Sequence, residues 1–309
     1  MSKENKDLNR SKLIARSGLC FLIVIISHYL VTTTLPDSKR LPERGPIVAA
    51  QKFILQEKTP RCVIVGSSFA DRLDPFNTDP ETTMITINGG SSFDGLALIK
   101  ERSSSQTPPK IIAIEINRLI VYDEKEWVTK LLSETNKKIW KSTPFLRDYN
   151  RPLSILGWPI HTGFNKLYLT VTSKLPLFKT TDARSTELQD RFNRNIARQK
   201  EYLEAGIEDD KLSSITSKLR AYVKEFSDKG AHIILFCMPI HPDLEKLETP
   251  RKLLAGIKNA FPAPEFSWLE NVDAAEYEYT DGIHLAPKSA EKYYTILTDK
   301  ITGVEKNER

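Results

Sequence analysis

The sequence has few cysteines, three among 309 residues, and none of them belongs to a recognisable site. It contains no C-x-x-C pair and no Cys/His spacing typical of zinc proteins, so no metal site is expected. Cys20 stands at the start of an apolar run rather than at its end, which argues against lipidation of an N-terminal cysteine. Cys62 and Cys237 lie in apolar runs typical of strands, so we expect buried thiols rather than a disulfide.

Long runs of charge of one sign are also missing. The 45 basic and 40 acidic residues are spread along the chain and leave a net charge of only +5. A nucleic-acid-binding face needs clustered Lys and Arg, so no nucleic acid is expected as a partner. We find no internal repeats and no low-complexity tracts. The 40% hydrophobic content indicates one main globular domain with accessory segments.

The N-terminus predicts a membrane anchor. A basic segment, residues 1–17, precedes an apolar stretch, residues 18–35, that contains no Asp, Glu, Lys or Arg. As a helix this stretch would reach about 27 Å, close to the roughly 30 Å thickness of the hydrocarbon core. A cleaved signal peptide is the alternative, but no A-x-A-like site follows. We expect a signal anchor with the basic segment in the cytoplasm, which places the chain from Pro36 onward in the periplasm or outside the cell.

The rest of the chain alternates apolar runs with helical stretches. Residues 36–60 read as a stalk with a first helix, and residues 61–309 as the main domain. Helical periodicity over residues 213–230 ends at a glycine and leads directly into a strand. Strands that are buried on both faces and separated by helices predict an α/β fold, a three-layer α/β/α sandwich with a mostly parallel, flavodoxin-like sheet. The expected strands are RCVIVG near Val63, TMITING near Ile85, IIAIEIN near Ile114 and HIILFCMP near Leu235.

Residues 119–210 interrupt this alternation. The segment begins with a helical pattern and continues with aromatic clusters that are broken by prolines. We interpret it as an insertion of helices and loops over the sheet, which would form a cap or an edge that binds a polymer. The prolines are Pro144, Pro152, Pro159 and Pro176.

Candidate catalytic residues stand at the ends of the expected strands. Gly66-Ser67-Ser68 follows the first strand, and Asp281 precedes His284 by three residues near the C-terminus. A carboxylate at this spacing can hold an imidazole in the tautomer whose free nitrogen faces a nucleophile. Alone, D-x-x-H is better explained by a structural cap with a surface histidine. A catalytic interpretation therefore depends on the other motifs in the sequence.

Taken together, these blocks resemble the SGNH (GDSL-like) hydrolase superfamily. Four blocks occur in the order of that superfamily, each at the end of an expected strand or before the last helix. They are GSSF at 66–69, INGGSS at 87–92, IEIN at 114–117 and DGIH at 281–284. The insertion at 119–210 has no counterpart in the resemblance.

The resemblance implies a role for each matching residue. Ser68 would be the nucleophile, His284 its general base and Asp281 the residue that orients His284. The oxyanion hole would use the backbone N–H groups of Ser68 and Gly89 and the side-chain amide of Asn117. These roles are chemically sound, because a serine hydroxyl needs an adjacent base and a fixed donor stabilises the developing oxyanion. No cofactor and no metal are implied.

Two departures from the superfamily's pattern leave alternatives open. Ser67 stands where Asp is usual, a change shared with the membrane-linked branch that is similar to alginate acetylation proteins and teichoic acid D-alanine transfer proteins. Either Ser67 or Ser68 could therefore face the substrate, and the block register favours Ser68. Gly89 is followed by Gly90, which could be the oxyanion donor instead.

Two further residues are candidates for substrate binding. Arg118 follows Asn117 and could bind an anionic substrate, although an ion pair, with Glu115 nearby, is the simpler interpretation. His241, in MPIHPD, follows the fourth expected strand and could border the same cleft. A loop histidine held by its neighbouring prolines is the simpler interpretation there.

The sequence thus leads to two functional hypotheses. The first is a membrane-anchored serine esterase or O-acyltransferase that acts on acyl esters, chiefly acetyl, of a cell-envelope or exported polysaccharide. Its partners would be the membrane, an acylated glycan and a multi-spanning membrane acyltransferase. The second is a catalytically silent relative that serves as a scaffold or a glycan-binding component of a polysaccharide assembly complex.

Overall fold

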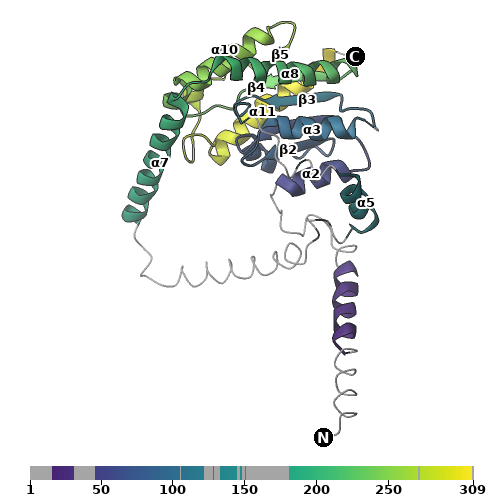
Figure 1. Cartoon of the computed structure of the whole chain (residues 1–309). Coiled ribbons are helices and arrows are strands. Elements are labelled where there is room, and N and C mark those ends of the chain that lie inside the picture. Colours follow the sequence, from purple (N-terminus) through teal and green to yellow (C-terminus); the bar gives the residue numbers. More distant parts are fainter. Residues whose placement is uncertain are drawn as a thin grey trace. The chain divides into compact units, whose positions relative to one another are not determined.

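A parallel β-sheet organises the chain, as the computed structural model shows (Figure 1). The predicted α/β fold with a parallel sheet is confirmed. The structure describes residues 16–30, 46–104, 106–121, 128, 133–144, 147, 150, 181–270 and 272–307.

The sheet has five strands in the order β2-β1-β3-β4-β5, and every neighbouring pair is parallel. This is the 2-1-3-4-5 order of flavodoxin-like sheets. The first four strands coincide with the four predicted apolar runs. The fifth has only two residues, too few for a period to be read from the sequence. The strands are β1 (Cys62–Ser67), β2 (Thr82–Ile87), β3 (Ile111–Glu115), β4 (His232–Phe236) and β5 (Ser267–Trp268).

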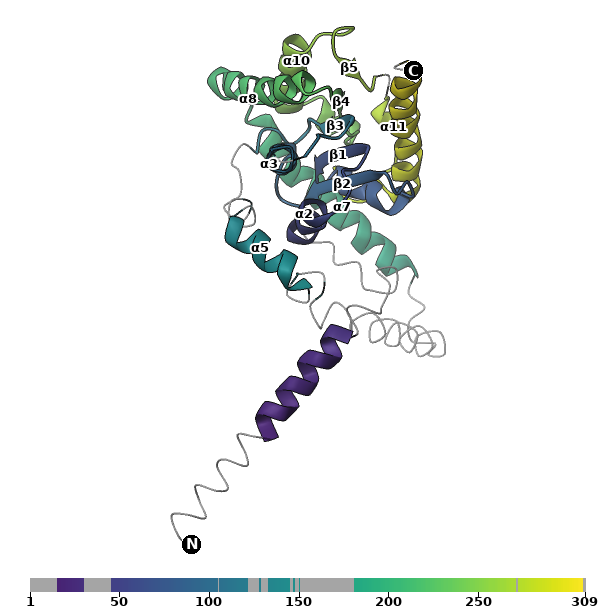
Figure 2. The same cartoon turned by 90° about the vertical axis from the view of Figure 1, so that its right-hand side faces the viewer.

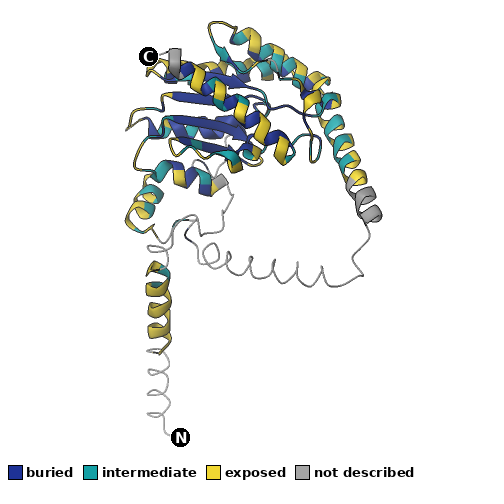
Figure 3. Cartoon of the chain, turned by 180° about the vertical axis from the view of Figure 1, so that it is seen from behind, coloured by how far each residue is buried: buried dark blue, intermediate teal, exposed yellow. Residues whose placement is uncertain are grey.

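Helices cover both faces of this sheet (Figure 2). Helix α11 (Pro287–Asn307) packs on one face, and α2 (Pro46–Leu55), α3 (Ser92–Arg102) and α8 (Asp209–Asp228) lie on the other. The strands between them are buried, as Figure 3 shows. Continuous apolar strands are therefore stable here, because both of their faces are removed from water. The buried side chains of α8 are those that the helical period predicts, Ile215, Leu219, Val223 and Phe226.

Further helices complete the described chain between and beyond the strands. The longest of them, α7, packs against α9 and α10 and belongs to the same unit as the sheet. Residues 151–180 of the predicted insertion lie outside the described residues. These elements are η2 (Ala70–Phe76), α5 (Glu134–Ser142), α7 (Thr181–Glu204), α9 (Pro242–Glu245), α10 (Glu248–Ala260) and η6 (Ala274–Glu276).

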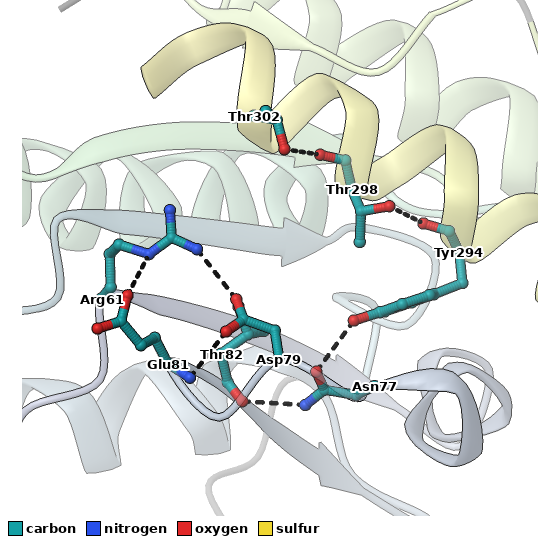
Figure 4. Close-up of polar contacts among 8 residues, drawn as sticks. All are labelled: Arg61, Asn77, Asp79, Glu81, Thr82, Tyr294, Thr298 and Thr302. Carbon is teal, nitrogen blue, oxygen red and sulfur yellow. Dashed lines mark hydrogen bonds and ion pairs between the residues drawn. The ribbon is translucent and has the colours of Figure 1, made fainter. Parts of the chain in front are cut away.

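A polar cluster ties α11 to the connection between β1 and β2 (Figure 4). The side-chain amide of Asn77 donates to the carbonyl oxygen of Thr82 at 2.9 Å and accepts from the Tyr294 hydroxyl at 3.0 Å. Arg61 pairs with Asp79 and with Glu81 in the same region. Such partly exposed ion pairs contribute little, about 1 kcal/mol or less each, so the Asn77 hydrogen bonds are the more specific link between helix and sheet.

The chain divides into two units, which are described separately. One comprises Met1–Arg44 and Thr135–Phe178, and the other Gly45–Glu134 and Lys179–Arg309. In the first unit, residues 16–30 form a helix whose large apolar side chains are exposed. Among the described residues, no helix is both long enough and apolar enough to cross a membrane. Residues 31–35 of the predicted anchor lie outside the described residues.

Candidate active site

The parallel sheet places three of the sequence blocks at one edge. Ser68 directly follows β1, which lies between β2 and β3 in the sheet. Gly89 comes two residues after β2, and Asn117 comes two residues after β3. In open α/β sheets of this order, ligands bind outside the carboxyl ends of the strands, at the β1/β3 switch point. Ser68 therefore stands where such folds place their sites.

The structure brings Ser68, His284 and Asp281 into one hydrogen-bonded chain. His284 Nε2 lies 3.0 Å from Ser68 Oγ, and His284 Nδ1 lies 2.7 Å from Asp281 Oδ2. Because a carboxylate only accepts, Nδ1 carries the proton, which leaves Nε2 as the acceptor for the serine hydroxyl. The three side chains thus have the relation of a nucleophile, a base and a group that orients the base.

The loop that carries Asp281 and His284 is held by its own backbone. Asp281 Oδ1 accepts the backbone N–H groups of His284 at 2.9 Å and of Ile283 at 3.3 Å. Burial opposes ionisation of Asp281, but the hydrogen bonds from His284 and Ile283 outweigh it and hold the pKa of Asp281 below its ordinary value. The carboxylate therefore stays charged and keeps the imidazole oriented at neutral pH.

His241 supports this loop from the neighbouring segment. Its backbone N–H donates to the carbonyl oxygen of Gly282 at 2.8 Å, and its Nδ1 accepts from the backbone N–H of Asp243 at 3.3 Å. Its ring packs edge-on against Phe192 and Tyr279, with centroids 5.9 Å and 5.8 Å away. The ring also lines an open groove of about 1080 Å³ that includes Asp281. His241 is thus the N-cap of α9 and also lines the groove beside the triad of Ser68, His284 and Asp281.

Ser67 is occupied by a different partner, which the sequence interpretation missed. Its backbone N–H and its hydroxyl both donate to Glu115 Oε2, at 2.6 Å and 2.7 Å. The Ser67 hydroxyl accepts in turn from the backbone N–H of Phe69 at 3.2 Å. Ser67 is 1% exposed, whereas Ser68 is half-buried and faces His284. Of the two hydroxyls, only that of Ser68 is placed beside the imidazole.

The burial of Glu115 is a feature that the sequence interpretation missed. Its side chain is fully buried and accepts from Ser67 at the end of β1. Burial raises the pKa of Glu115, and the two hydrogen bonds from Ser67 and the charge of Arg118 oppose that rise. Gly66 permits this close approach, because a Cβ there would lie 2.5 Å from Ala70 Cβ and 2.9 Å from Glu115 Oε2. Only glycine fits at that position.

The two glycines that could supply an oxyanion donor, Gly89 and Gly90, differ in whether the backbone N–H group already donates within the turn. The backbone N–H of Gly90 donates to the carbonyl oxygen of Ile87 at 2.9 Å, which closes the turn after β2. Gly89 adopts φ of +75°, a conformation that suits glycine and fixes the direction of the peptide. Between the two adjacent glycines, the turn hydrogen bond of Gly90 leaves Gly89 as the better donor.

Asn117 is held by a two-point contact with the chain after β4. Its Nδ2 donates to the carbonyl oxygen of Met238 at 2.8 Å, and its Oδ1 accepts the Met238 backbone N–H at 2.7 Å. One Nδ2 hydrogen is used in this contact, and the Asn117 amide also interacts with the Cys237 thiol, where it opposes the rise in pKa that burial causes. The contact fixes the plane of the amide before any substrate arrives.

Phe69 and Arg118 form the border of the site. The ring of Phe69 meets the His284 ring edge-on, with centroids 5.4 Å apart. The Arg118 guanidinium lies over the same Phe69 ring, 5.9 Å from its centroid. Phe69 is thus the residue that links Arg118 to His284, and substrate binding by Arg118 stays a prediction.

The described residues offer no group of His, Cys, Asp or Glu arranged to hold a metal ion. Cys62 and Cys237 are free thiols, as the sequence predicts, and burial raises the pKa of each to about 12. Neither is therefore a reactive thiolate near neutral pH.

Comparison of the chain with protein-family models, with curated proteins and with solved structures finds no match in any of the three.

The buried contact of Glu115 with Ser67 gives the first prediction. Glu115→Ala leaves two Ser67 donors without an acceptor and creates a cavity, so it should lower the free energy of unfolding by about 2 to 4 kcal/mol. Glu115→Gln keeps an acceptor oxygen and should cost less than half as much. Urea denaturation of both variants beside the wild type measures these costs.

Comparison of the wild type with Glu115→Gln tests whether folding raises the pKa of Glu115. A carboxyl group whose pKa is raised by folding stabilises the folded state at low pH and loses that contribution as pH rises through the folded pKa. The difference in free energy of unfolding between wild type and Glu115→Gln should therefore move in favour of the variant from about pH 4 to pH 8. If this difference in free energy of unfolding stays constant with pH, or moves in favour of the wild type, the pKa of Glu115 is not raised by folding.

Proposed function

We propose that the chain is a serine esterase or O-acyltransferase in which Ser68 carries the acyl group. The observation that carries the proposal is the hydrogen-bonded chain Asp281–His284–Ser68 at the carboxyl edge of the parallel sheet. The four blocks that resemble SGNH hydrolases, and the three-layer sandwich expected of that superfamily, support the same chemistry. In this proposal the turn held by Glu115 presents Ser68 to the substrate.

The acylation step follows from the geometry. Ser68 Oγ attacks the carbonyl carbon of an acyl ester while its proton passes to His284 Nε2. Asp281 stabilises the imidazolium that forms, and donors from Ser68, Gly89 and Asn117 stabilise the negative oxygen. The tetrahedral intermediate then collapses, His284 returns the proton to the alcohol oxygen, and the alcohol leaves. The product of this step is an acyl group on Ser68.

The second step decides between an esterase and a transferase. His284 takes a proton from water or from a sugar hydroxyl, and the resulting oxygen nucleophile attacks the acyl-Ser68 carbonyl. The bond between the acyl carbon and Ser68 Oγ then breaks, and His284 returns the proton to Ser68 Oγ. Water gives a carboxylic acid, whereas a sugar hydroxyl gives a new ester. The open groove beside Asp281 has room for such an acceptor and carries Arg72, Arg191 and Tyr279 on its walls. Arg118 and His241 remain candidates for contacts with the substrate.

We propose a location on the basis of the N-terminal sequence and a substrate class on the basis of the resemblance. In the proposal, residues 18–35 anchor the chain with residues 36–309 outside the cytoplasm, in the periplasm or at the cell surface. The substrate is an acylated glycan of the envelope or an exported polysaccharide, and a multi-spanning membrane acyltransferase is the expected partner. The membrane-linked branch of the superfamily, with its serine in place of aspartate, favours this assignment.

Turnover of p-nitrophenyl acetate by the full-length chain in mild detergent tests the proposal. Ser68→Ala and His284→Ala should each lower kcat by at least about 10³-fold, because the nucleophile or its base is lost. Asp281→Asn should lower kcat by about 10² to 10⁴-fold, because the imidazole loses its tautomer preference.

Two substitutions of the same types serve as controls for this assay. Ser104 is exposed, and His232 pairs with Ser267 at the opposite end of β4 from Met238. Ser104→Ala and His232→Ala should keep wild-type turnover. Wild-type turnover no faster than that of Ser68→Ala and His284→Ala would reject the enzyme and leave the silent scaffold or glycan-binding component as the better account.

The anchor is tested with a reporter fused after Arg309. A reporter that is active only outside the cytoplasm should be active in the wild-type fusion, because the basic segment 1–17 stays in the cytoplasm. Val24→Arg, which places a charge near the centre of the apolar run, should reduce that activity strongly, since such a charge costs about 3 kcal/mol on insertion. Activity confined to a cytoplasmic reporter would overturn the orientation.

A further inference from the structure

A small apolar pocket lies next to the triad and is separate from the open groove. Its wall includes Phe69, which follows Ser68, and Ile283, which precedes His284. Asn117, the candidate oxyanion donor, lines it as well. The remaining wall comes largely from helices α7 and α10, through Leu203, Leu253 and Leu254. The pocket is thus lined by residues that are adjacent in sequence to Ser68 and His284, the two residues that carry the proposed chemistry.

The volume of this pocket limits what it can hold. It measures about 50 Å³, whereas a cavity of about 150 Å³ accommodates benzene with its six heavy atoms. On that scale the pocket has room for roughly two or three heavy atoms. Filling it with a short alkyl chain would remove that chain from water without displacing protein atoms, while a longer chain would have to push the walls apart.

The two hollows beside the triad differ in character. The groove is open, about 1080 Å³ in volume, and lined by arginine, amide and aromatic side chains. The pocket is small, and isoleucine and leucine are the commonest of its lining residues, with Arg118 and Gln199 among the others. Asp281 belongs to the groove and Ile283 to the pocket, so the loop 280–284 contributes to both. The acyl ester of a sugar likewise has two different parts, an apolar acyl chain and a polar alcohol.

We infer that this pocket is the acyl-binding subsite and that it restricts the enzyme to acyl groups of about two to four carbons, with the polar alcohol in the groove. The inference depends on the proposed function, because it assigns the two halves of its substrate. It adds a specificity determinant built from α7 and α10, which the four sequence blocks do not contain. Oxygen of the acyl carbonyl would then point toward Asn117, and the chain carbons toward Leu203 and Leu254.

Thr249 adds to the polar groups of this mainly apolar wall, which also include Asn117, Arg118 and Gln199. Its side chain is 2% exposed, and its hydroxyl has no hydrogen-bond partner within the described part of the chain. A buried hydroxyl without a partner is destabilising.

A series of p-nitrophenyl esters, from acetate through butyrate and hexanoate to octanoate, tests the inference with the full-length chain. The wild type should lose at least about tenfold in kcat/KM between butyrate and octanoate. Leu254→Ala, which enlarges the pocket from α10, should raise the octanoate-to-acetate ratio of kcat/KM at least about tenfold. Leu203→Ala, from α7, should change the ratio in the same direction.

The matched control is Leu212→Ala. Leu212 is also half-buried and packs against Gly256 of α10, but it does not line the pocket. It should keep the chain-length profile of the wild type. A wild-type profile that is flat from acetate to octanoate, or enlarged variants whose ratios equal that of Leu212→Ala, would overturn the subsite.

A binding measurement separates this inference from the proposed function. If no ester is turned over, the proposed function fails, and the pocket is then judged on Ser68→Ala protein by ligand-observed NMR with acetate, butyrate, hexanoate and octanoate. Preferential binding of the two short carboxylates that shifts toward longer chains in Ser68→Ala/Leu254→Ala supports the subsite. Absence of binding, or binding without that preference, overturns it.

Discussion

The buried carboxyl group of Glu115, at the end of β3, receives both the backbone N–H and the hydroxyl of Ser67 at the end of β1. This contact joins two neighbouring strands at the point where the chain turns out of the sheet. Gly66 leaves room for the Glu115 side chain, and the Ser67 hydroxyl donates its hydrogen to Glu115. The next residue, Ser68, is thereby left as the one that faces outward. The proposed chemistry depends on this local arrangement more than on any other contact of the fold.

The second requirement is that two distant parts of the chain meet. Ser68 and His284 are 216 positions apart, and their hydrogen bond exists because α11 packs on the sheet immediately after the loop that carries His284. His241 supports that loop through Gly282, and Asn117 grips Met238 across 121 positions. These polar contacts cluster at the carboxyl edge of the strands. The apolar burial between α11 and the sheet supplies the stability that holds them in place.

Much of this arrangement could be predicted from the sequence. Four apolar runs marked the four longer strands. The blocks at the ends of the first and third runs contain Ser68 and Asn117, and the block before the last helix contains Asp281 and His284; the resemblance implied their roles. The two-residue β5 gave no periodic signal. The burial of Glu115 was missed because a charged residue is usually exposed, and only the three-dimensional pairing with Ser67 reverses that expectation. The contact of Asn117 with Met238 likewise depends on strand order, which local patterns do not encode.

The central claim is that Ser68, and not Ser67, is an activated nucleophile. The most direct test is reaction of the full-length chain with a fluorophosphonate probe, followed by mass spectrometry of the peptides that contain Gly66–Phe69. The account predicts one adduct, on Ser68, that is absent from Ser68→Ala and strongly reduced in His284→Ala. An adduct on Ser67, or equal labelling of wild type and Ser68→Ala, would contradict it.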